Sequence, residues 1–144
     1  MSTVDQIRLL TSSDLQTLLD SDAFDNDVDM IQARAFLSSE NHKIVGAIKS
    51  GELIGFASGV ILLHPDKQPM LFIAEVGVNE EYQRRGIGAD LTNTLIQVAR
   101  DVGCQGIWVA TEADNSAARG LYRKLEANET NDIVVYDWDG AMEK

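Results

Sequence analysis

The chain has 144 residues and a formal net charge of −11, from 12 Lys and Arg residues against 23 Asp and Glu residues. A general nucleic-acid-binding protein needs a basic surface to contact phosphates, so this charge disfavours that class. The hydrophobic fraction of 44% is typical of a globular protein, and residues 1–144 are enough for one domain with its own core. An acidic surface attracts cationic partners, although it also suits an ordinary acidic protein of the cytosol.

The single cysteine, Cys104, excludes an internal disulfide, and there is no CxxC motif to bind a metal. We therefore expect no metal and a reducing, cytoplasmic location. Because no apolar run approaches the length of a membrane-spanning helix, we expect no membrane partner either.

The periodicity of the apolar residues predicts an α/β fold with a mixed sheet. One segment, "MLFIAEVGV", is almost entirely apolar, which predicts a central strand covered on both faces. In chain order the predicted elements are a strand in 4–10, helices in 11–21 and around 31–36, strands in 42–49, 53–63 and 70–78, a helix in 87–102, a strand in 106–111, a helix in 115–125 and a last strand in 132–139.

The segment "EYQRRGIGADL" lies between the strand in 70–78 and the helix in 87–102. The first N–H groups of a helix have no intrahelical partner, and the helix dipole favours an anion there. Gly86 and Gly88 allow close approach of the backbone to a ligand, and Arg84 and Arg85 add positive charge. These features predict a pyrophosphate site, although an ordinary tight turn is the alternative. A dinucleotide motif would need a third glycine where Leu91 stands, and a Walker A motif would need Gly-Lys-Ser/Thr.

The run from Gln83 to Gly88, "QRRGIG", resembles the acetyl-CoA signature of the GCN5-related N-acetyltransferases (GNAT). Asn115, followed by "ARGLYRKL", is similar to a second element of that family. The resemblance extends over residues 44–138 and implies the GNAT fold, a mixed sheet flanked by about four helices. Within the family the chain is most similar to aminoglycoside 3-N-acetyltransferases. One departure is Leu125-Glu126-Ala127, where the family commonly has Leu-Gly-Phe, so the course of residues 126–130 is not predicted.

The resemblance implies that acetyl-CoA is the co-substrate. In the family, the strand before the signature offers free N–H and C=O groups to the pantetheine arm, and one N–H group stabilises the oxyanion. Asn115 would contact the same arm, although as a helix N-cap it would also have a purely structural role. The residues expected to bind the cofactor are Val76, Val78, Gln83, Arg84, Arg85, Gly86, Ile87, Gly88, Ala89 and Asn115.

The resemblance assigns the general acid to Tyr122, which would protonate the leaving thiolate; the alternative is a tyrosine that only packs its helix against the core. An ammonium substrate must also lose a proton, directly or through water. Glu75 is the first candidate for this base, because a charged residue in an apolar central strand is costly to bury without a purpose. Asp137 and Glu112 are alternatives, and a structural ion pair would also explain Glu75.

An acidic segment joins the first two predicted helices, and Asp137 and Asp139 end the last predicted strand. The resemblance places both groups near the acceptor cleft, whereas charge runs are more often solvated surface. The aspartates of the first group are Asp20, Asp22, Asp25, Asp27 and Asp29. Expected substrate contacts are Asp25, Asp27, Glu112 and Asp137.

We therefore expect acetylation of a primary amine of a small cationic substrate, with an aminoglycoside, acetylated at its 3-N position, as the first choice; antibiotic resistance would follow. The alternatives are a protein, peptide or polyamine N-acetyltransferase, and a non-catalytic acyl-CoA-binding module. The sequence does not set the oligomeric state, and a homodimer is one option.

Overall fold

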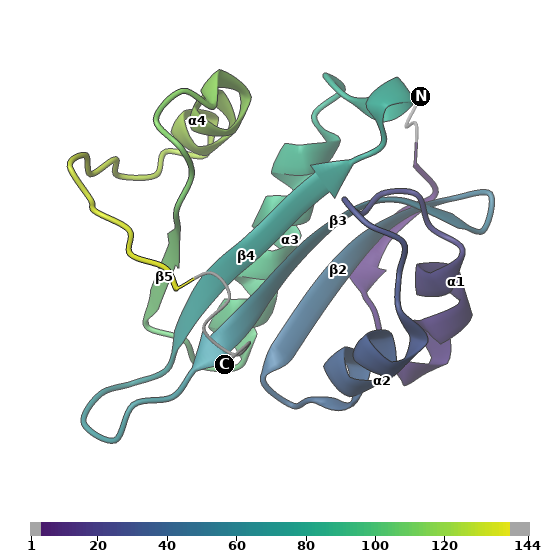
Figure 1. The fold of residues 1–144 in the computed structure, drawn as a ribbon, viewed down its shortest axis with the longest axis horizontal. Coiled ribbons are helices and arrows are strands. Elements are labelled where there is room, and N and C mark those ends of the chain that lie inside the picture. The colour runs from purple at the N-terminus through teal and green to yellow at the C-terminus, as the bar shows by residue number, and fades with distance from the viewer. Residues whose placement is uncertain (1–3, 139–144) are drawn as a thin grey trace.

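The computed structural model describes residues 4–138, and a five-stranded mixed sheet forms its centre (Figure 1). The strand order is β1-β2-β3-β4-β5; the first four strands are antiparallel neighbours, and β5 is parallel to β4. The strands are β1 (Gln6–Leu9), β2 (His42–Lys49), β3 (Glu52–Leu62), β4 (Met70–Val78) and β5 (Gly106–Val109).

Helices cover both faces of this sheet, as the sequence predicts. Helices α1 and α2 lie on one face, and α3 crosses the other (Figure 1). Helix α4 follows β5. The helices are η1 (Ser12–Asp14), α1 (Leu15–Leu19), α2 (Met30–Ser38), η2 (Glu80–Tyr82), α3 (Ile87–Asp101) and α4 (Ser116–Lys124). In the described part of the chain, no helix is long and apolar enough to cross a membrane.

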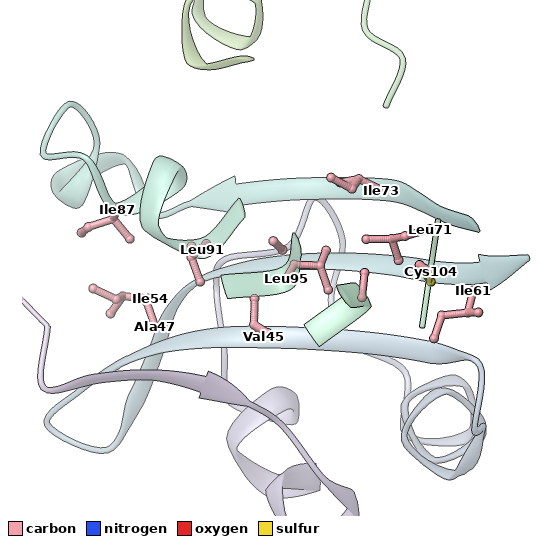
Figure 2. Close-up of a cluster of buried hydrophobic side chains, with 12 residues drawn as sticks. Val45, Ala47, Ile54, Ile61, Leu71, Ile73, Ile87, Leu91, Leu95 and Cys104 are labelled. Carbon is pink, nitrogen blue, oxygen red and sulfur yellow. The ribbon is translucent and has the colours of Figure 1, made fainter. Parts of the chain in front are cut away.

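The larger core cluster lies between α3 and the sheet (Figure 2). Ile87, Leu91 and Leu95 project from α3 at helical spacing and are buried, as their periodicity predicts. They contact residues such as Val45 and Leu71 on β2 and β4. Because Ile87 is the first residue of α3, this packing also fixes where the helix begins.

The strands that are covered on both faces are β2 and β3, not β4. Burial of β4 stops at Ile73, and Ala74 and Glu75 are exposed. The prediction of a fully covered β4 is therefore wrong, and so is the argument that Glu75 bears a burial cost. An apolar run shows that a strand has apolar neighbours, but it cannot show where those neighbours end.

The predicted last strand is also absent from the described residues. Residues 132–138 have no strand partner, and Ile133, Val134, Val135, Tyr136 and Trp138 are each 70–79% exposed. An alternating apolar pattern makes a segment suitable for a sheet, but only a hydrogen-bonding neighbour makes it a strand. Asp137 therefore does not end a strand, and Asp139 lies outside the described residues.

A β-bulge interrupts the pairing of β3 and β4. Ser58 pairs with Glu75 while Gly59 pairs with Ile73, which leaves Ala74 as an extra residue in β4. A bulge bends its strand and increases the local twist. The last pair between β4 and β5 joins Ile73 to Val109, so the two strands part directly at the bulge.

Gly59 permits this distortion, because a Cβ atom there would lie 2.6 Å from the Phe72 carbonyl oxygen. We predict that Gly59→Ala lowers the free energy of unfolding by about 1–3 kcal/mol, the usual range for overpacking. The matched control is Gly120→Ala in α4, where a Cβ would meet nothing within 4 Å. That variant should raise stability by up to about 1 kcal/mol, because alanine favours helices over glycine. Urea unfolding of both variants checks the prediction, and equal effects would contradict it.

Candidate functional site

The side of β4 that faces away from β3 has no strand partner beyond Ile73 within the described structure. Asn79 donates its N–H to the Ile54 carbonyl on the β3 side. Because backbone groups alternate in direction along a strand, those of Val76 and Val78 point away from β3. The Gln83 side-chain amide donates to the Val78 carbonyl at 3.0 Å, so the next loop reaches this open side. Val76 and Val78 thus lie on a side of β4 without a strand partner, which is the arrangement that the resemblance implies.

The start of α3 lies just beyond this open strand. The first bond of the helix runs from the Asp90 N–H to the Gly86 carbonyl, which leaves the N–H groups of residues 87–89 without helical acceptors. Gly86 has a φ of 82°, in the left-handed region that glycine adopts readily. Arg84 has a φ of 64°, and the Arg85 guanidinium lies 5.6 Å from the centroid of the Tyr82 ring. These donors and cations suit a pyrophosphate.

At position 88, the packing of the protein itself does not require glycine. A Cβ there would lie 3.8 Å from Leu121 and 4.0 Å from Val76 and Val78, which is ordinary van der Waals contact. The protein itself therefore has room for a side chain at this position. The space that the missing side chain leaves lies between the open strand and α4, where an extended cofactor arm would pass. This arrangement fits the predicted cofactor.

A pocket of about 230 Å³ lies between the open end of β4 and α4. It brings together five of the predicted site residues: Asp25, Glu75, Val76, Asn115 and Tyr122. Its other lining residues are Ala23, Phe56, Ala74, Gly77, Val109, Ala110, Thr111 and Ala118. Residues from β3, β4, β5, α4 and the segment after α1 thus meet at one place.

Tyr122 is half-buried in this pocket, and burial raises the pKa of its phenol above its usual value. The phenol therefore keeps its proton at neutral pH, which is the state that a proton donor needs. Glu75 lines the same pocket but is exposed, so its carboxylate is reachable by solvent and by a ligand. An acid and a candidate base thus face one space.

A second, larger pocket of about 670 Å³ adjoins the first, and both include Ala23 and Asp25. Its lining carries the carboxylates of Asp22, Asp25, Glu80 and Glu81. A pocket with four acidic side chains favours a cationic occupant.

Three expected residues lie elsewhere. Asp27, Glu112 and Asp137 are all exposed, and none is among the described residues that line either pocket. Of the four residues expected to contact the acceptor, only Asp25 lines the two pockets. In the described residues, no group of three or more His, Cys, Asp or Glu side chains could hold a metal ion.

Hydrogen bonds at both ends of α4 fix the position of this helix, and with it that of Tyr122. At the start, the Asn115 side chain accepts a hydrogen bond from the Ala118 N–H at 3.0 Å, so Asn115 caps the helix as expected. At the end, the Ala127 N–H donates to the Tyr122 carbonyl and the Glu126 N–H to the Arg123 carbonyl, each at 3.0 Å. This is a Schellman motif, which the absence of a glycine in the sequence concealed.

An ion-pair cluster beside the pocket was not predicted from the sequence. The Arg119 guanidinium donates to both oxygens of Glu129, at 3.1 and 3.2 Å, and to the Ala113 carbonyl at 2.6 Å. Arg123 also donates to Glu129 at 3.0 Å. Hydrogen bonds from Arg119 and then Arg123 lower the pKa of Glu129 to about 2. The only signal in the sequence was the pair of arginines four residues apart on one helical face.

Residues 7–126 match the acetyltransferase (GNAT) family. The chain belongs to that family. The mixed sheet with its four α-helices is accordingly the GNAT fold. GNAT acetyltransferases use acetyl-CoA, in agreement with the fit of the α3 start and the open strand.

Individual relatives share only a modest fraction of their sequence with this chain. The chain is 32% identical over 84 residues to an L-2,4-diaminobutyric acid acetyltransferase of Shouchella clausii, a match that covers 58% of this chain and 46% of that protein. The chain thus matches about half the length of this curated relative.

Two solved structures share the GNAT fold at 19% sequence identity. One is the aminoglycoside acetyltransferase meta-AAC0020, from an uncultured soil metagenomic sample, in complex with sisomicin; its TM-score is 0.80, with 92% of this chain and 94% of that chain covered. The other is AAC(6')-Iy in complex with the bisubstrate analog CoA-S-monomethyl-acetylneamine; its TM-score is 0.78, with 92% and 97% covered. At this identity the likeness establishes the fold alone.

The end of α4 gives a testable consequence for stability. Glu126 has a φ of 64°, a left-handed conformation that costs a non-glycine residue about 1–2 kcal/mol. We predict that Glu126→Gly, which restores the usual residue of the motif, raises the free energy of unfolding by about 1 kcal/mol. The control is Lys124→Gly, one residue inside the helix boundary, which should lower it by about the same amount. Thermal and urea unfolding measure both, and a loss of stability in Glu126→Gly would contradict the assignment.

Proposed function

We propose that the chain is an acetyl-CoA-dependent N-acetyltransferase that acetylates a primary amine of a small cationic compound. The observation that carries this proposal is the pocket where the open side of β4, the Tyr122 phenol and the Glu75 carboxylate meet. Acyl transfer to an amine requires a site for the thioester, an acid for the leaving thiolate and a base for the ammonium. Residues suited to each requirement line or adjoin this one pocket.

The cofactor would be held largely by backbone groups. The free N–H groups at the start of α3 and the side chains of Arg84 and Arg85 would bind its pyrophosphate. The open N–H and C=O groups of Val76 and the N–H group of Val78 would orient its extended arm, while the Val78 carbonyl accepts from the Gln83 side chain. When bound, acetyl-CoA supplies the acetyl group as a thioester. An N–H group of this strand would donate to the carbonyl oxygen as negative charge develops there.

Two side chains would move protons. Tyr122 would donate its phenolic proton to the departing thiolate, and its raised pKa keeps that proton available. Glu75 would accept a proton from the ammonium group, directly or through a water molecule. Its place in the pocket, next to Val76, supports this role over Glu112 and Asp137, which line neither pocket.

The acceptor would occupy the acidic pocket. Asp25 lines both pockets, so a polycation held by the four carboxylates could present one amine to the reaction pocket. This geometry, the sequence resemblance and the sisomicin complex of a protein with the same fold support an aminoglycoside. The resemblance favours the 3-N position, whereas AAC(6')-Iy is named for another position.

A panel of amines tests the proposal. Thiol release from acetyl-CoA should occur with aminoglycosides and not with a neutral amine of similar size. NMR of the product distinguishes 3-N from 6'-N acetylation. Polyamines and basic peptides are included, because preference for either would identify another acceptor class. Binding of acetyl-CoA without thiol release for any amine would leave a non-catalytic acyl-CoA-binding protein and reject the enzymatic proposal.

Gly88→Ala tests the cofactor site. A Cβ at residue 88 fits the protein but would occupy the space proposed for the cofactor arm. Acetyl-CoA affinity should therefore fall by about tenfold or more, while stability rises by up to about 1 kcal/mol, since alanine replaces a glycine in a helix. Calorimetry measures the affinity, with Gly120→Ala as the control that should bind normally. Unchanged affinity in Gly88→Ala would reject the proposed path.

Tyr122→Phe tests the general acid. This variant keeps the packing of the ring and removes only the hydroxyl group. We expect kcat to fall by about 10²-fold or more, which is typical of general-acid catalysis, with little change in acetyl-CoA affinity. Steady-state kinetics and calorimetry give the two values. A kcat equal to that of the parent would reject Tyr122 as the general acid.

Asp25→Asn tests the cationic acceptor, with Asp27→Asn as a matched control two residues away that lines neither pocket. Asp25→Asn should raise the KM for the amine and weaken its dependence on salt, because fewer carboxylates attract the substrate. The comparison runs from about 0.01 M to about 0.15 M salt, where the screening length falls from about 30 Å to about 8 Å. Equal behaviour of the two variants would show that Asp25 is only solvated surface.

A further inference from the structure

Ser58 on β3 is a polar residue buried in an apolar part of the sheet, and only 7% of it is exposed. Its neighbour on β2 is Ile44, and Phe56 lies two positions away on the same face of β3. Both of these side chains belong to the smaller core cluster. A hydroxyl group in such surroundings costs free energy unless it has a hydrogen-bond partner.

Within residues 4–138, the Ser58 hydroxyl has no such partner. Its oxygen is nevertheless in contact with solvent, because Nε2 of His64 is the only fully buried side-chain polar atom of this part of the chain that lacks a partner. The hydroxyl of Ser58 is therefore free to bind a small molecule that reaches it.

This opening lies on the side of the candidate base. Glu75 is the direct cross-strand partner of Ser58 at the bulge, and directly opposite residues project from the same face with Cβ atoms about 4.5–5.5 Å apart. Ile44 on the other side is buried whereas Glu75 is exposed, so solvent reaches the hydroxyl from the Glu75 side. Phe56 and Glu75 both line the reaction pocket, which thus extends to the neighbourhood of Ser58.

We propose that Ser58 is a positioning residue whose hydroxyl holds the water molecule through which Glu75 receives the proton of the substrate amine. This inference rests on the proposed function. A bound water needs two to four polar partners and enough room. The Ser58 hydroxyl, the Glu75 carboxylate and the substrate ammonium would be three partners, and the pocket of about 230 Å³ offers the room.

The hydrogen bonds of this water set the path of the proton. The Ser58 O–H donates to the water oxygen, and the water donates one hydrogen to a carboxylate oxygen of Glu75. The ammonium N–H bond breaks as its proton moves to the water oxygen, while the water passes another proton to Glu75. The products are a neutral amine and a protonated carboxyl group, and the water and Ser58 are unchanged. Ser58 itself does not titrate; it orients the water.

A double-mutant cycle on the full chain tests whether Ser58 acts through Glu75. The variants are Ser58→Ala, Glu75→Gln and the two combined, assayed with acetyl-CoA and sisomicin, or with the amine that the panel prefers. Ser58→Ala should lower kcat by about tenfold, a part of what acid–base catalysis contributes, and leave acetyl-CoA affinity unchanged. In the Glu75→Gln background the same change should have little further effect, because groups that act as a unit are not additive. Additive losses would overturn the proposal.

The pH dependence gives a readout that a structural role would not change. Between about pH 7 and about pH 9.5, a growing share of an alkyl amine is neutral before it binds, since its reference pKa is about 10.4. The ratio of parent to Ser58→Ala kcat should therefore fall toward one as the pH rises. Asp25 and Tyr122, the other titratable side chains of the pocket, are present in both proteins, so their titration cancels in this ratio. A constant ratio would overturn the proposal.

Stability provides the control. Because the Ser58 hydroxyl has no partner in the described structure, Ser58→Ala should keep or raise the midpoint of urea unfolding. A clear fall would identify a structural hydroxyl and overturn the proposal. Thr94→Ala, which removes a hydroxyl that donates to the Asp90 carbonyl on α3, should leave kcat unchanged at every pH.

Failure of this inference differs from failure of the proposed function. If Glu75→Gln lowers kcat and Ser58→Ala does not, the proposal for Ser58 is overturned and Glu75 remains the base. If Glu75→Gln has the kcat of the parent, the assignment of Glu75 is rejected, and the proposal for Ser58 is rejected with it.

Discussion

The parting of β4 and β5 is the feature on which the site depends. Two parallel strands that stayed paired would satisfy each other's backbone groups and leave no space between them. The bulge at Ala74 ends that pairing at Ile73 and Val109, and β4 continues with one side free. The open side of the strand, the pocket and the exposure of Glu75 all follow from this single extra residue. On β3, the bulge requires glycine at position 59, since any side chain there would collide with the Phe72 carbonyl.

Helix α4 closes the other wall of the pocket, and three separate contacts determine where it lies. The Asn115 cap sets its first turn, the Schellman motif sets its last, and Arg119 joins it to both the preceding loop and the following segment. Solvent reaches this cluster, since the Glu129 side chain is 36% exposed, and it screens the charges; the cluster therefore specifies geometry more than it adds stability. Tyr122 thereby sits on a helix that is fixed at both ends, as a proton donor at a defined distance would require.

Much of the fold was predictable because periodicity reports local burial. The positions of Leu91 and Leu95 predicted α3 and its buried face, and the glycines near the start of α3 predicted a ligand loop. Two failures have a common origin. The cover of β4 and the pairing of residues 132–138 depend on which other segments lie beside them, and a local pattern contains no such information.

In the candidate site, too, some residues were predictable from the sequence and others were not. Asn115 and Tyr122 were assigned from motifs, and Glu75 from its place in an apolar strand. All three line one pocket, although the burial argument for Glu75 was wrong. Asp27, Glu112 and Asp137 were grouped by charge and expected position, and they lie outside both pockets. The cluster of Arg119, Arg123 and Glu129 escaped prediction because it depends on how the chain returns after the Schellman motif.

The strand order has a consequence for how the molecule assembles. Strands β2 to β4 are neighbours both in sequence and in space and are joined by short loops, so they pair at low entropic cost, whereas β1 is joined to β2 through α1 and α2. Strand β5 reaches β4 only through a crossover that contains α3, and such non-local pairing is slow to form. Glu75 belongs to this unit of β2 to β4 and Tyr122 to the part that docks after the crossover. The pocket is therefore among the last regions of the molecule to form, and a nascent chain would complete most of its sheet before its site exists.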